Sequence, residues 1–410
     1  MSQAVFQGTA GFPPPQLLQD PYPFYKMLRS TNPVFRAPVG DADSPGLWIL
    51  TRHRDVQAVL KDARFSVDRR RAAIVEQFRD RLPIQAALGE EGGLRSMLLM
   101  DPPDHTRVRG LVSKAFTPRR VAELRPRIEA IVAGLLDAIG GGAAFDLIDA
   151  IAAPLPAIVI AELLGVPAED HRQFKEWSSA LVSAIGSVNP LDARAQFEDA
   201  LGRLLDYLRG IIAERRKAPR DDLISAMLEA QEERDALSDA ELLATSNLLL
   251  IAGHETTTNL IGNGTLALLR NPEEFARLRD DRSLLRSAID ELLRYDSPVQ
   301  ATARVALEPV ALDGATLPTG AMVMTGIGAA NRDPEVFDDP DRLDLGRTNN
   351  HHLSFGFGAH FCLGAPLARL EAEIAFDALL DRYPKLELAS ETLTYRPSPV
   401  LRGLTALPVR

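Results

Sequence analysis

The chain of 410 residues contains a single cysteine, and this residue most constrains what the sequence can build. Without a second thiol there is no internal disulfide, and no metal centre can be held by several thiolates. Cys362 lies within residues 355–364, FGFGAHFCLG, where three glycines surround it. Because glycine has no Cβ atom, such a backbone can approach a flat or bulky partner closely. Cys362 therefore has to be explained by itself.

A helix is predicted directly after the cysteine. Pro366 suits a first helical turn, and Leu367, Leu370 and Ile374 recur at helical spacing. The sulfur would then lie near a helix N-terminus, where the helix dipole and free N–H groups stabilise a thiolate. One thiolate, a glycine-rich loop and the nearby basic His360 suit axial ligation of a haem iron. An inert core thiol is the alternative interpretation.

Residues 355–364 resemble the haem-binding loop of the cytochrome P450 family, Phe-Gly-x-Gly-x-His-x-Cys-x-Gly, with every fixed position present. The resemblance implies haem b as the cofactor, with Cys362 as the axial thiolate ligand of its iron. It also implies that Phe355, His360 and Gly364 contact the haem. It extends from about Asp20 to the C-terminus and implies the P450 fold, mainly α with small β-sheets. In that fold a long central helix lies over the haem and the thiolate loop lies beneath it.

The sequence contains a candidate for this long helix. Ser238 and Glu241 form a capping-box pattern, and apolar-rich sequence continues to Arg270, before an Asn-Pro pair stops it. The middle, residues 252–258, has a glycine and three threonines, which are poor helix formers. Such a conflict predicts a π-bulge or widened turn at a functional site. The alternative is a regular helix whose threonine hydroxyls bond back to the preceding turn.

This segment resembles the oxygen-activating part of the P450 central helix, Ala-Gly-x-acid-Thr. Breaking the O–O bond of dioxygen needs protons, delivered in an apolar pocket by positioned groups or ordered water. The resemblance implies that Thr256 donates a hydrogen bond to the bound oxygen and that Glu255 relays protons from solvent. Gly253 and Ala252 are expected to leave room above the iron. His254 is expected to point elsewhere, not to bind metal.

Two residues four apart are predicted to hold an anion. His105 and Arg109 share one face of a helix that follows a proline-rich turn, so both side chains can reach the same group. The resemblance implies that this group is a haem propionate, since a buried carboxylate needs charged hydrogen-bond partners. By the same resemblance, Arg304 and His360 are further propionate ligands. A surface role is the alternative for His105 and Arg109.

Glu291 and Arg294 lie three apart in a predicted helix, which by itself indicates an ordinary helical ion pair. The resemblance to the P450 Glu-x-x-Arg motif implies a buried network, with Arg342 as its third member. Removing one partner of such a network should be costly. We assign these three residues to folding and haem retention.

Composition limits the remaining possibilities. Short strands are expected near residues 47–51, 302–307 and 321–325, and helices elsewhere. No linker or repeat is apparent, so residues 1–410 are interpreted as one P450 domain whose residues 1–19 form a flexible segment. No signal peptide or membrane anchor is apparent, which favours a cytoplasmic protein, and we expect a monomer. A formal net charge of −10 argues against nucleic acid as a partner.

Oxygen activation at a haem needs electrons, and the chain has neither a further cysteine cluster nor a dinucleotide-binding fingerprint. The family implies a ferredoxin or flavodoxin with an NAD(P)H-dependent reductase as the partner. The substrate pocket is expected to use the 69–100 loop and residues 174–189, whose largely apolar character suggests a lipophilic small molecule. The basic stretch 69–81 leaves room for an acid near the entrance. Six single pocket residues are predicted: Asn247, Leu248, Val299, Gln300, Thr302 and Val400.

The leading hypothesis is therefore a haem-thiolate monooxygenase that inserts one oxygen atom from O2 into an unactivated C–H or C=C bond. An alternative keeps the fold and haem but uses no reductive O2 activation, as in a peroxygenase, isomerase or dehydratase. The Glu255 and Thr256 pair argues against that alternative. A non-catalytic haem or ligand-binding protein is a third possibility. A cysteine hydrolase is disfavoured, because no nucleophile motif surrounds Cys362.

Overall fold

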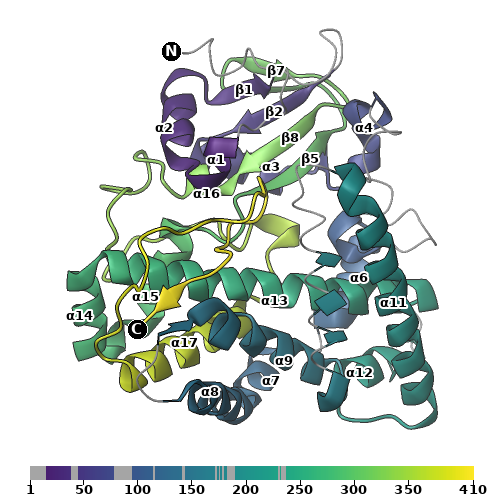
Figure 1. The fold of residues 1–410 in the computed structure, drawn as a ribbon. Helices are drawn as coiled ribbons and strands as arrows, with labels where there is room; N and C mark the ends of the chain where they lie inside the picture. The colour runs from purple at the N-terminus through teal and green to yellow at the C-terminus, as the bar shows by residue number, and fades with distance from the viewer. Residues whose placement is uncertain are drawn as a thin grey trace.

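The computed structural model of the chain describes residues 15–37, 45–77, 95–113, 116–140, 144–170, 173–174, 176–177, 180–181, 190–229, 231 and 237–410. It is mainly helical and carries small β-sheets, as predicted (Figure 1). Among the described residues, no helix is both long enough and apolar enough to cross a membrane.

A five-stranded sheet forms one end of the molecule (Figure 1). Its strands run in the order β1 (Val34–Ala37), β2 (Leu47–Leu50), β8 (Met322–Gly326), β5 (Ala301–Ala306) and β3 (Phe65–Ser66). Only the β2 and β8 pair is parallel; the other three pairs are antiparallel. Apolar side chains such as Leu50 and Val323 are fully buried between the sheet and its helices. The three predicted strand positions are confirmed.

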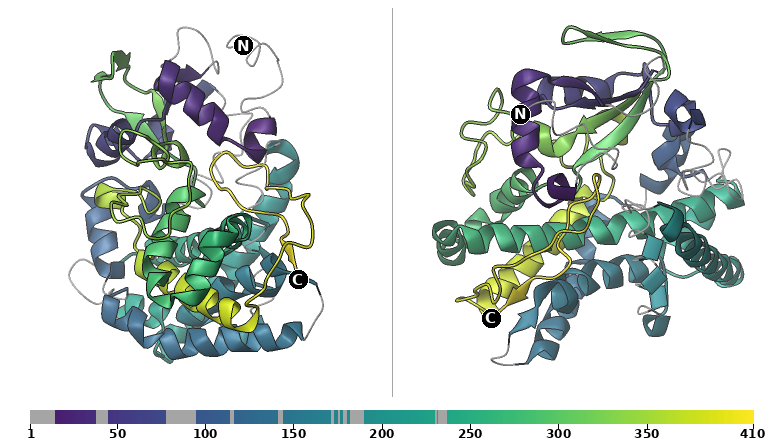
Figure 2. Two further views of the ribbon diagram at one scale, coloured as in Figure 1. Left: turned by 90° about the vertical axis from the view of Figure 1, so that its left-hand side faces the viewer. Right: turned by 45° about the horizontal axis from the view of Figure 1, so that its top comes forward.

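The central helix is α13 (Asp239–Arg270), which crosses the helical part of the molecule (Figure 1). The views in Figure 2 keep the sheet on one side of α13 and most other helices on the other. It packs against α9 (Pro154–Leu163), α11 (Pro190–Lys217), α15 (Leu285–Tyr295) and α17 (Ala365–Arg382). The predicted capping box starts it, because Ser238 and Glu241 each accept from the other's backbone N–H.

Close packing explains two glycines within this helix. A Cβ atom on Gly262 would lie 2.5 Å from Cδ1 of Ile148, and one on Gly264 would lie 2.8 Å from a ring carbon of Phe376. Both distances are far below ordinary carbon–carbon contact. Glycine is thus retained here for helix–helix contact, despite its poor helix propensity.

The predicted irregularity in α13 is not observed. Residues 252–258 are regular α-helix. Thr256 Oγ1 donates to the carbonyl of Ala252 at 2.9 Å, and Thr257 Oγ1 donates to that of Gly253 at 3.2 Å. These bonds to the preceding turn satisfy the hydroxyls without opening the helix, so the regular-helix alternative is correct. A π-helical turn lies elsewhere, at Ile148–Ala152.

The N-terminal expectation needs one correction. Pro15–Gln19 form the short helix α1, and Leu18 is buried, so the prediction of a flexible segment is wrong for these five residues. The rest of that segment lies outside the described residues. The remaining elements are α2 (Tyr22–Thr31), α3 (His53–Lys61), α4 (Ala73–Gln77), α6 (Asp104–Ser113), α7 (Pro118–Glu123), α8 (Arg125–Ile139), α12 (Leu223–Glu229), α14 (Pro272–Asp280), α16 (Ile327–Ala330), β4 (Phe145–Asp146), β6 (Val310–Leu312), β7 (Ala315–Leu317) and β9 (Pro408–Val409).

Candidate active site

The cysteine loop joins a 3₁₀ turn at Gly358–His360 to α17. Gly358 has a φ of 74°, and a Cβ atom there would lie 3.0 Å from the carbonyl oxygen of Leu60 in α3. Both facts require glycine at this position. The backbone N–H of Cys362 donates to the carbonyl of Phe355 at 2.8 Å, which closes the loop. The predicted helix after the cysteine is confirmed.

The thiol of Cys362 behaves differently from the prediction. Its side chain has accessible surface, but the surrounding protein desolvates the sulfur enough to raise the pKa of the thiol above its ordinary value. The N–H groups of Gly364 and Ala365 and the charge of Arg109 lower this pKa, but desolvation outweighs them. The helix N-terminus alone therefore does not provide a thiolate. A bound metal cation would, because it displaces the thiol proton.

Two histidines meet beside this loop. The rings of His105 on α6 and His360 lie 3.9 Å apart, centroid to centroid, and are tilted by 34°. Burial lowers the pKa of His360 to about 3, helped by His105, Arg304 and Arg109, and opposed by Asp101. Burial also lowers the pKa of His105, whose buried Nε2 has no hydrogen-bond partner. Both imidazoles are therefore neutral at neutral pH and can donate a single N–H each to an anion.

Arg109 and Arg304 lie close enough to His360 to influence its charge. Arg109 donates to the carbonyl of Phe361 at 2.6 Å, next to the cysteine. Arg304 is 7 % exposed and donates to the carbonyl of Ala303 at 2.8 Å. Burial and the neighbouring Arg69 lower the pKa of Arg304 to about 10, while Asp101 opposes them. Neither Arg109 nor Arg304 forms an ion pair with an acidic residue in the described part of the chain.

We call Arg69, His105, Arg109, Arg304 and His360 the cationic cluster. Buried cations are normally paired with carboxylates or other anions, and this cluster lacks a facing acid among the described residues apart from Asp101. A ligand with two carboxylates would supply the missing charge, and haem has two propionates. The cluster and the adjacent cysteine therefore fit a haem. The structure brings together Cys362, His105, Arg109, Arg304 and His360, as the sequence predicted.

On α13, Glu255 is buried and forms an ion pair with Arg396 of the C-terminal segment. Oε2 of Glu255 also lies 3.8 Å from Nε2 of His254. The partner Arg396 was missed, because nothing in the sequence links two residues 141 positions apart. His254 packs within the helix, with Nδ1 3.4 Å from the carbonyl of Leu250.

Gly253 lies against a neighbouring helix. A Cβ atom on Gly253 would lie 3.2 Å from the Ile160 side chain of α9, which is tighter than ordinary contact. Glycine therefore allows close helix contact here, and its expected role above the iron stays a prediction. Ala252 is exposed, which agrees with the expectation of open space at that position.

The predicted pocket residues are only partly brought together. Val299 and Leu401 form a β-bridge, and the N–H of Gln300 donates to the carbonyl of Val400 at 2.7 Å, so these two segments do lie side by side. The Gln300 side chain, however, is 2 % exposed and donates to the carbonyl of Ser297 at 2.8 Å. Its prediction as a pocket residue is wrong, because protein encloses the side chain: Oε1, which has no hydrogen-bond partner, lies against Gly328.

The other predicted pocket residues lie on the sheet, on α13 or outside the described residues. Thr302 Oγ1 lies 2.9 Å from Thr325 Oγ1 across the sheet. Asn247 and Leu248 lie half-buried on α13, and Asn247 Oδ1 has no hydrogen-bond partner. Residues 78–94 and most of 174–189 lie outside the described residues.

The Glu291 network is confirmed with one correction. Arg294 donates to both carboxylate oxygens of Glu291 at 2.8 Å, and both side chains are fully buried. The third side chain is Arg347, whose Nε lies 3.1 Å from Glu291. The side chain of Arg342 is 65 % exposed and pairs with Asp344. Arg342 contributes only its carbonyl, which accepts from Arg294 at 3.1 Å, because the turn there directs its side chain to solvent.

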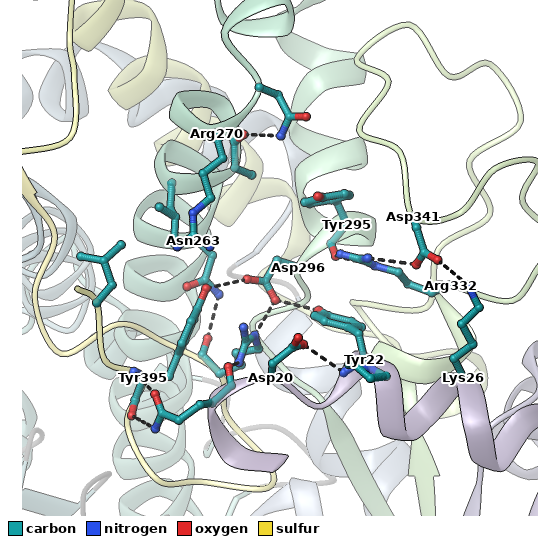
Figure 3. A pocket seen from close by; sticks show the side chains of 17 residues that line it. Asp20, Tyr22, Lys26, Asn263, Arg270, Tyr295, Asp296, Arg332, Asp341 and Tyr395 are labelled. Atoms are coloured by element: carbon teal, nitrogen blue, oxygen red, sulfur yellow. Dashed lines mark hydrogen bonds and ion pairs between the residues drawn. The ribbon is translucent and has the colours of Figure 1, made fainter. Parts of the chain in front are cut away.

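A cavity of about 590 Å³ lies beside the C-terminal part of α13 (Figure 3). It is bounded by α2, the C-terminal part of α13, the end of α15 and the C-terminal segment. Tyr22 and Arg402 donate to Asp296, each at 2.7 Å, and Arg332 pairs with Asp341 at 3.1 Å. These charges are matched within the protein. None of the predicted site residues lines the cavity. We interpret its polar network as structural, because it connects the N-terminal and C-terminal segments of the chain.

Comparison with known proteins identifies the family. The family model described as "Cytochrome P450" matches residues 24–393. The chain is 44 % identical to cytochrome P450 CYP107DY1 of Priestia megaterium, covering 97 % of this chain and 98 % of that protein. It is 45 % identical to the vitamin D(3) 25-hydroxylase of Pseudonocardia autotrophica, covering 95 % and 94 %.

Among solved structures, the myxobacterial cytochrome P450 CYP267B1 in complex with myristic acid superimposes with a TM-score of 0.87, at 40 % identity and with coverage of 100 % of this chain and 99 % of that chain. The chain belongs to the cytochrome P450 family. It is an enzyme of the P450 monooxygenase class, and its single cysteine is consistent with the haem-thiolate iron of that family.

Proposed function

We propose that the chain uses haem b, with Cys362 as the axial thiolate, to insert one oxygen atom from O2 into a lipophilic small molecule by hydroxylation or epoxidation. The observation that carries the proposal is the cationic cluster beside the only cysteine. Among the described residues, Asp101 alone faces its cations and balances them only in part, and its neighbour is the thiol that the family uses for iron. When bound, the haem supplies the activation of O2 and the transfer of an oxygen atom.

The protein residues have separate roles in this proposal. Arg109, Arg304 and the two histidines bind the propionates and orient the ring. Gly358 lets the cysteine loop lie close to α3. Phe355 and Gly364 complete the loop, through the carbonyl that accepts from Cys362 and the N–H that lowers the pKa of the thiol. These contacts hold the sulfur in one position.

Proton delivery falls to the acid and alcohol on α13. Thr256 donates to a helix carbonyl in the present structure, so its hydroxyl must rotate to donate toward the reacting oxygen. Glu255 forms an ion pair with Arg396, which places its carboxylate toward the C-terminal segment. We infer that Glu255 takes protons from solvent and passes them to Thr256. Arg396 holds the Glu255 side chain in place between catalytic cycles.

Electrons come in this proposal from a ferredoxin or flavodoxin with an NAD(P)H-dependent reductase. Phe361, adjacent to the cysteine, is 43 % exposed, so the cysteine side of the molecule has an apolar surface residue for such a partner. We further propose a cytoplasmic monomer that binds neither nucleic acid nor a membrane.

The substrate class rests on pocket character and on relatives. One relative is named for vitamin D(3) and a structural neighbour holds myristic acid, both largely apolar molecules. In this chain, Asn247 Oδ1 on α13 is an unused acceptor, and Leu248 and Val299 supply apolar surface. We therefore propose a lipophilic substrate with one hydroxyl or amide group that donates to Asn247.

The first test is the visible spectrum of the dithionite-reduced protein with carbon monoxide. We expect a strongly red-shifted Soret band in the wild type and its loss in Cys362→Ala. His254→Gln is the matched control, because His254 is the other candidate metal ligand on the sequence, and its variant should keep the band. A shifted band that survives in Cys362→Ala would contradict the proposal.

The second test separates the monooxygenase from a peroxygenase, isomerase or dehydratase. Turnover of a substrate that shifts the spin state is measured under ¹⁸O₂, with and without a ferredoxin, its reductase and NADPH. We expect one ¹⁸O atom in the product only when the redox partners are present. We also expect Thr256→Ala to consume NADPH with less product and more hydrogen peroxide. Product without reductant would favour the alternative.

A further inference from the structure

Arg69 belongs to the cationic cluster, but the proposed function gives it no role. It begins a short 3₁₀ turn, Arg69–Arg71, which packs against β5, the strand that carries Arg304. The residue is half-buried, and its Nε is buried and has no hydrogen-bond partner in the described structure. Desolvation lowers the pKa of Arg69. A buried N–H of a guanidinium without a hydrogen-bond partner is unfavourable, so this position favours an anion.

The neighbouring arginines of the same turn do not share this situation. Arg70 is exposed and makes a bidentate pair with Asp68, at 2.7 Å for both contacts, and Arg71 also lies within 3.9 Å of Asp68. Asp68 therefore pairs with both exposed arginines, and it also lies 3.3 Å from Arg95. The basic start of this loop contains one arginine whose charge is not matched by that acid.

The neighbour of Arg69 is a second cation, Arg304, whose ionised form Arg69 disfavours. Asp101 is the acid whose charge acts on Arg304. Asp101 already accepts from the Ser66 hydroxyl and from the N–H of Val67 at 2.9 Å. Desolvation is the one influence resolved on Arg69. An additional anion near both guanidinium groups would offset their repulsion.

Charge counting identifies that anion. Arg69, Arg109 and Arg304 carry one positive charge each, and Asp101 carries one negative charge, so the balance is two positive charges. Haem b presents two propionates. With Arg69 included, two propionates would balance the net charge of these four residues.

We infer that Arg69 is a haem-propionate ligand that acts together with Arg304. The inference rests on the haem binding in the proposed function, but not on any catalytic step. It replaces the expectation that this basic loop binds an acidic substrate near the pocket entrance, as far as the described residues are concerned. The geometry also predicts that the reduction potential of the haem depends on the charge of Arg69, since a cation beside the propionates disfavours the ferric form.

The experiment compares Arg69→Met, Arg69→Lys and the control Arg71→Met as purified haem-loaded proteins. The rate of haem loss to excess apomyoglobin and the ferric/ferrous reduction potential are measured. A charged hydrogen bond contributes about 1.5–3 kcal/mol, so Arg69→Met should lose haem about tenfold to hundredfold faster. Its potential should become more negative. Arg69→Lys should keep the wild-type potential and lose haem more slowly than Arg69→Met, and Arg71→Met should match the wild type.

Three results would overturn the inference. Haem loss and potential in Arg69→Met that equal the wild type would show that Arg69 does not touch the propionates. Equal defects in Arg69→Met and Arg69→Lys would indicate a packing role, since charge would not matter. Unchanged haem retention with a weakened spin-state response to myristate, used as an acidic probe, would assign Arg69 to the substrate. None of these readouts requires turnover, so failure of the monooxygenase proposal remains distinguishable.

Discussion

Two buried charge clusters in this protein are built in opposite ways. In the Glu291 cluster, the carboxylate lies at the centre and accepts from Arg294 and Arg347, and the remaining N–H groups of Arg294 reach backbone carbonyls. In the cationic cluster, two arginines lie close together with Asp101 as the nearest acid. The first cluster is complete within the protein. In the proposed function, a bound anion completes the second.

The difference teaches how to separate structural charges from binding charges. Burial is similar in both places, since Arg294 is fully buried and Arg304 is 7 % exposed. The location of the counter-charge differs. The Asp296 network in Figure 3 belongs with the first kind, because Arg402 supplies its counter-charge, although it borders a cavity of about 590 Å³. Cavity size is thus a poorer guide to the site than an unmatched charge.

The largest expected effect concerns the complete cluster. Arg294→Met should lower the free energy of unfolding by about 3–5 kcal/mol, because it leaves the Glu291 carboxylate buried with only Arg347 as a charged partner. Denaturant unfolding followed by circular dichroism measures this. A loss below about 1 kcal/mol would show that the cluster is not the structural lock described here.

The next effect concerns a buried acid that has no charged partner among the described residues. Burial raises the pKa of Glu371 on α17 to about 8, and its Oε2 lacks a hydrogen-bond partner. Below the ordinary glutamate pKa both folded and unfolded states hold the proton. As the pH rises to about 8, the unfolded state releases the proton and the folded state keeps it, so stability falls and the loss is complete above that pH.

Glu371→Gln should remove this fall, which is on the order of a few kcal/mol between pH 5 and 8. The measurement is a set of denaturant unfolding curves across that range. Glu373→Gln is the matched control, because Glu373 lies two residues away but is partly exposed and paired with Arg125. An equal pH slope in the wild type and Glu371→Gln would contradict the assignment.

In the cationic cluster, replacing an arginine should weaken haem binding and not the stability of the fold. Arg304→Met should weaken haem affinity about tenfold to hundredfold, the equivalent of one charged hydrogen bond of about 1.5–3 kcal/mol. It should leave the circular dichroism of the chain unchanged, since no carboxylate in the described structure loses its partner. Haem titration with absorbance detection measures the affinity. A fold defect of the size expected for Arg294→Met would erase the distinction between the clusters.

The smallest expected effect tests the correction to the Glu291 network. Arg342→Met should change the free energy of unfolding by less than about 0.5 kcal/mol, because the side chain is exposed and only its carbonyl is used. Arg347→Met, the matched variant, should cost more than about 1 kcal/mol, since its guanidinium contacts a buried carboxylate. The reverse order would restore Arg342 as the third member.

Local signals allowed much of this protein to be predicted. The α13 boundaries follow from the Ser238 capping box and the Asn-Pro stop, which act within one turn of chain. The pairing of Glu291 with Arg294 follows from their spacing in one helix. The propionate candidates came from family resemblance, and the structure does gather them. In contrast, Arg347 was mistaken for Arg342, because an irregular turn has no periodicity that reveals where a side chain points.

The sequence by itself determined the unique thiol, the helix that follows it, the boundaries of the central helix and the family. These properties depend on residue identity and on contacts between near neighbours. Only the tertiary structure decided that Arg396 pairs with Glu255, that Ile160 fills the space beside Gly253 and that Arg69 lies beside Arg304. These contacts join residues far apart in the chain, and their energies depend on burial, which no local pattern of residues records.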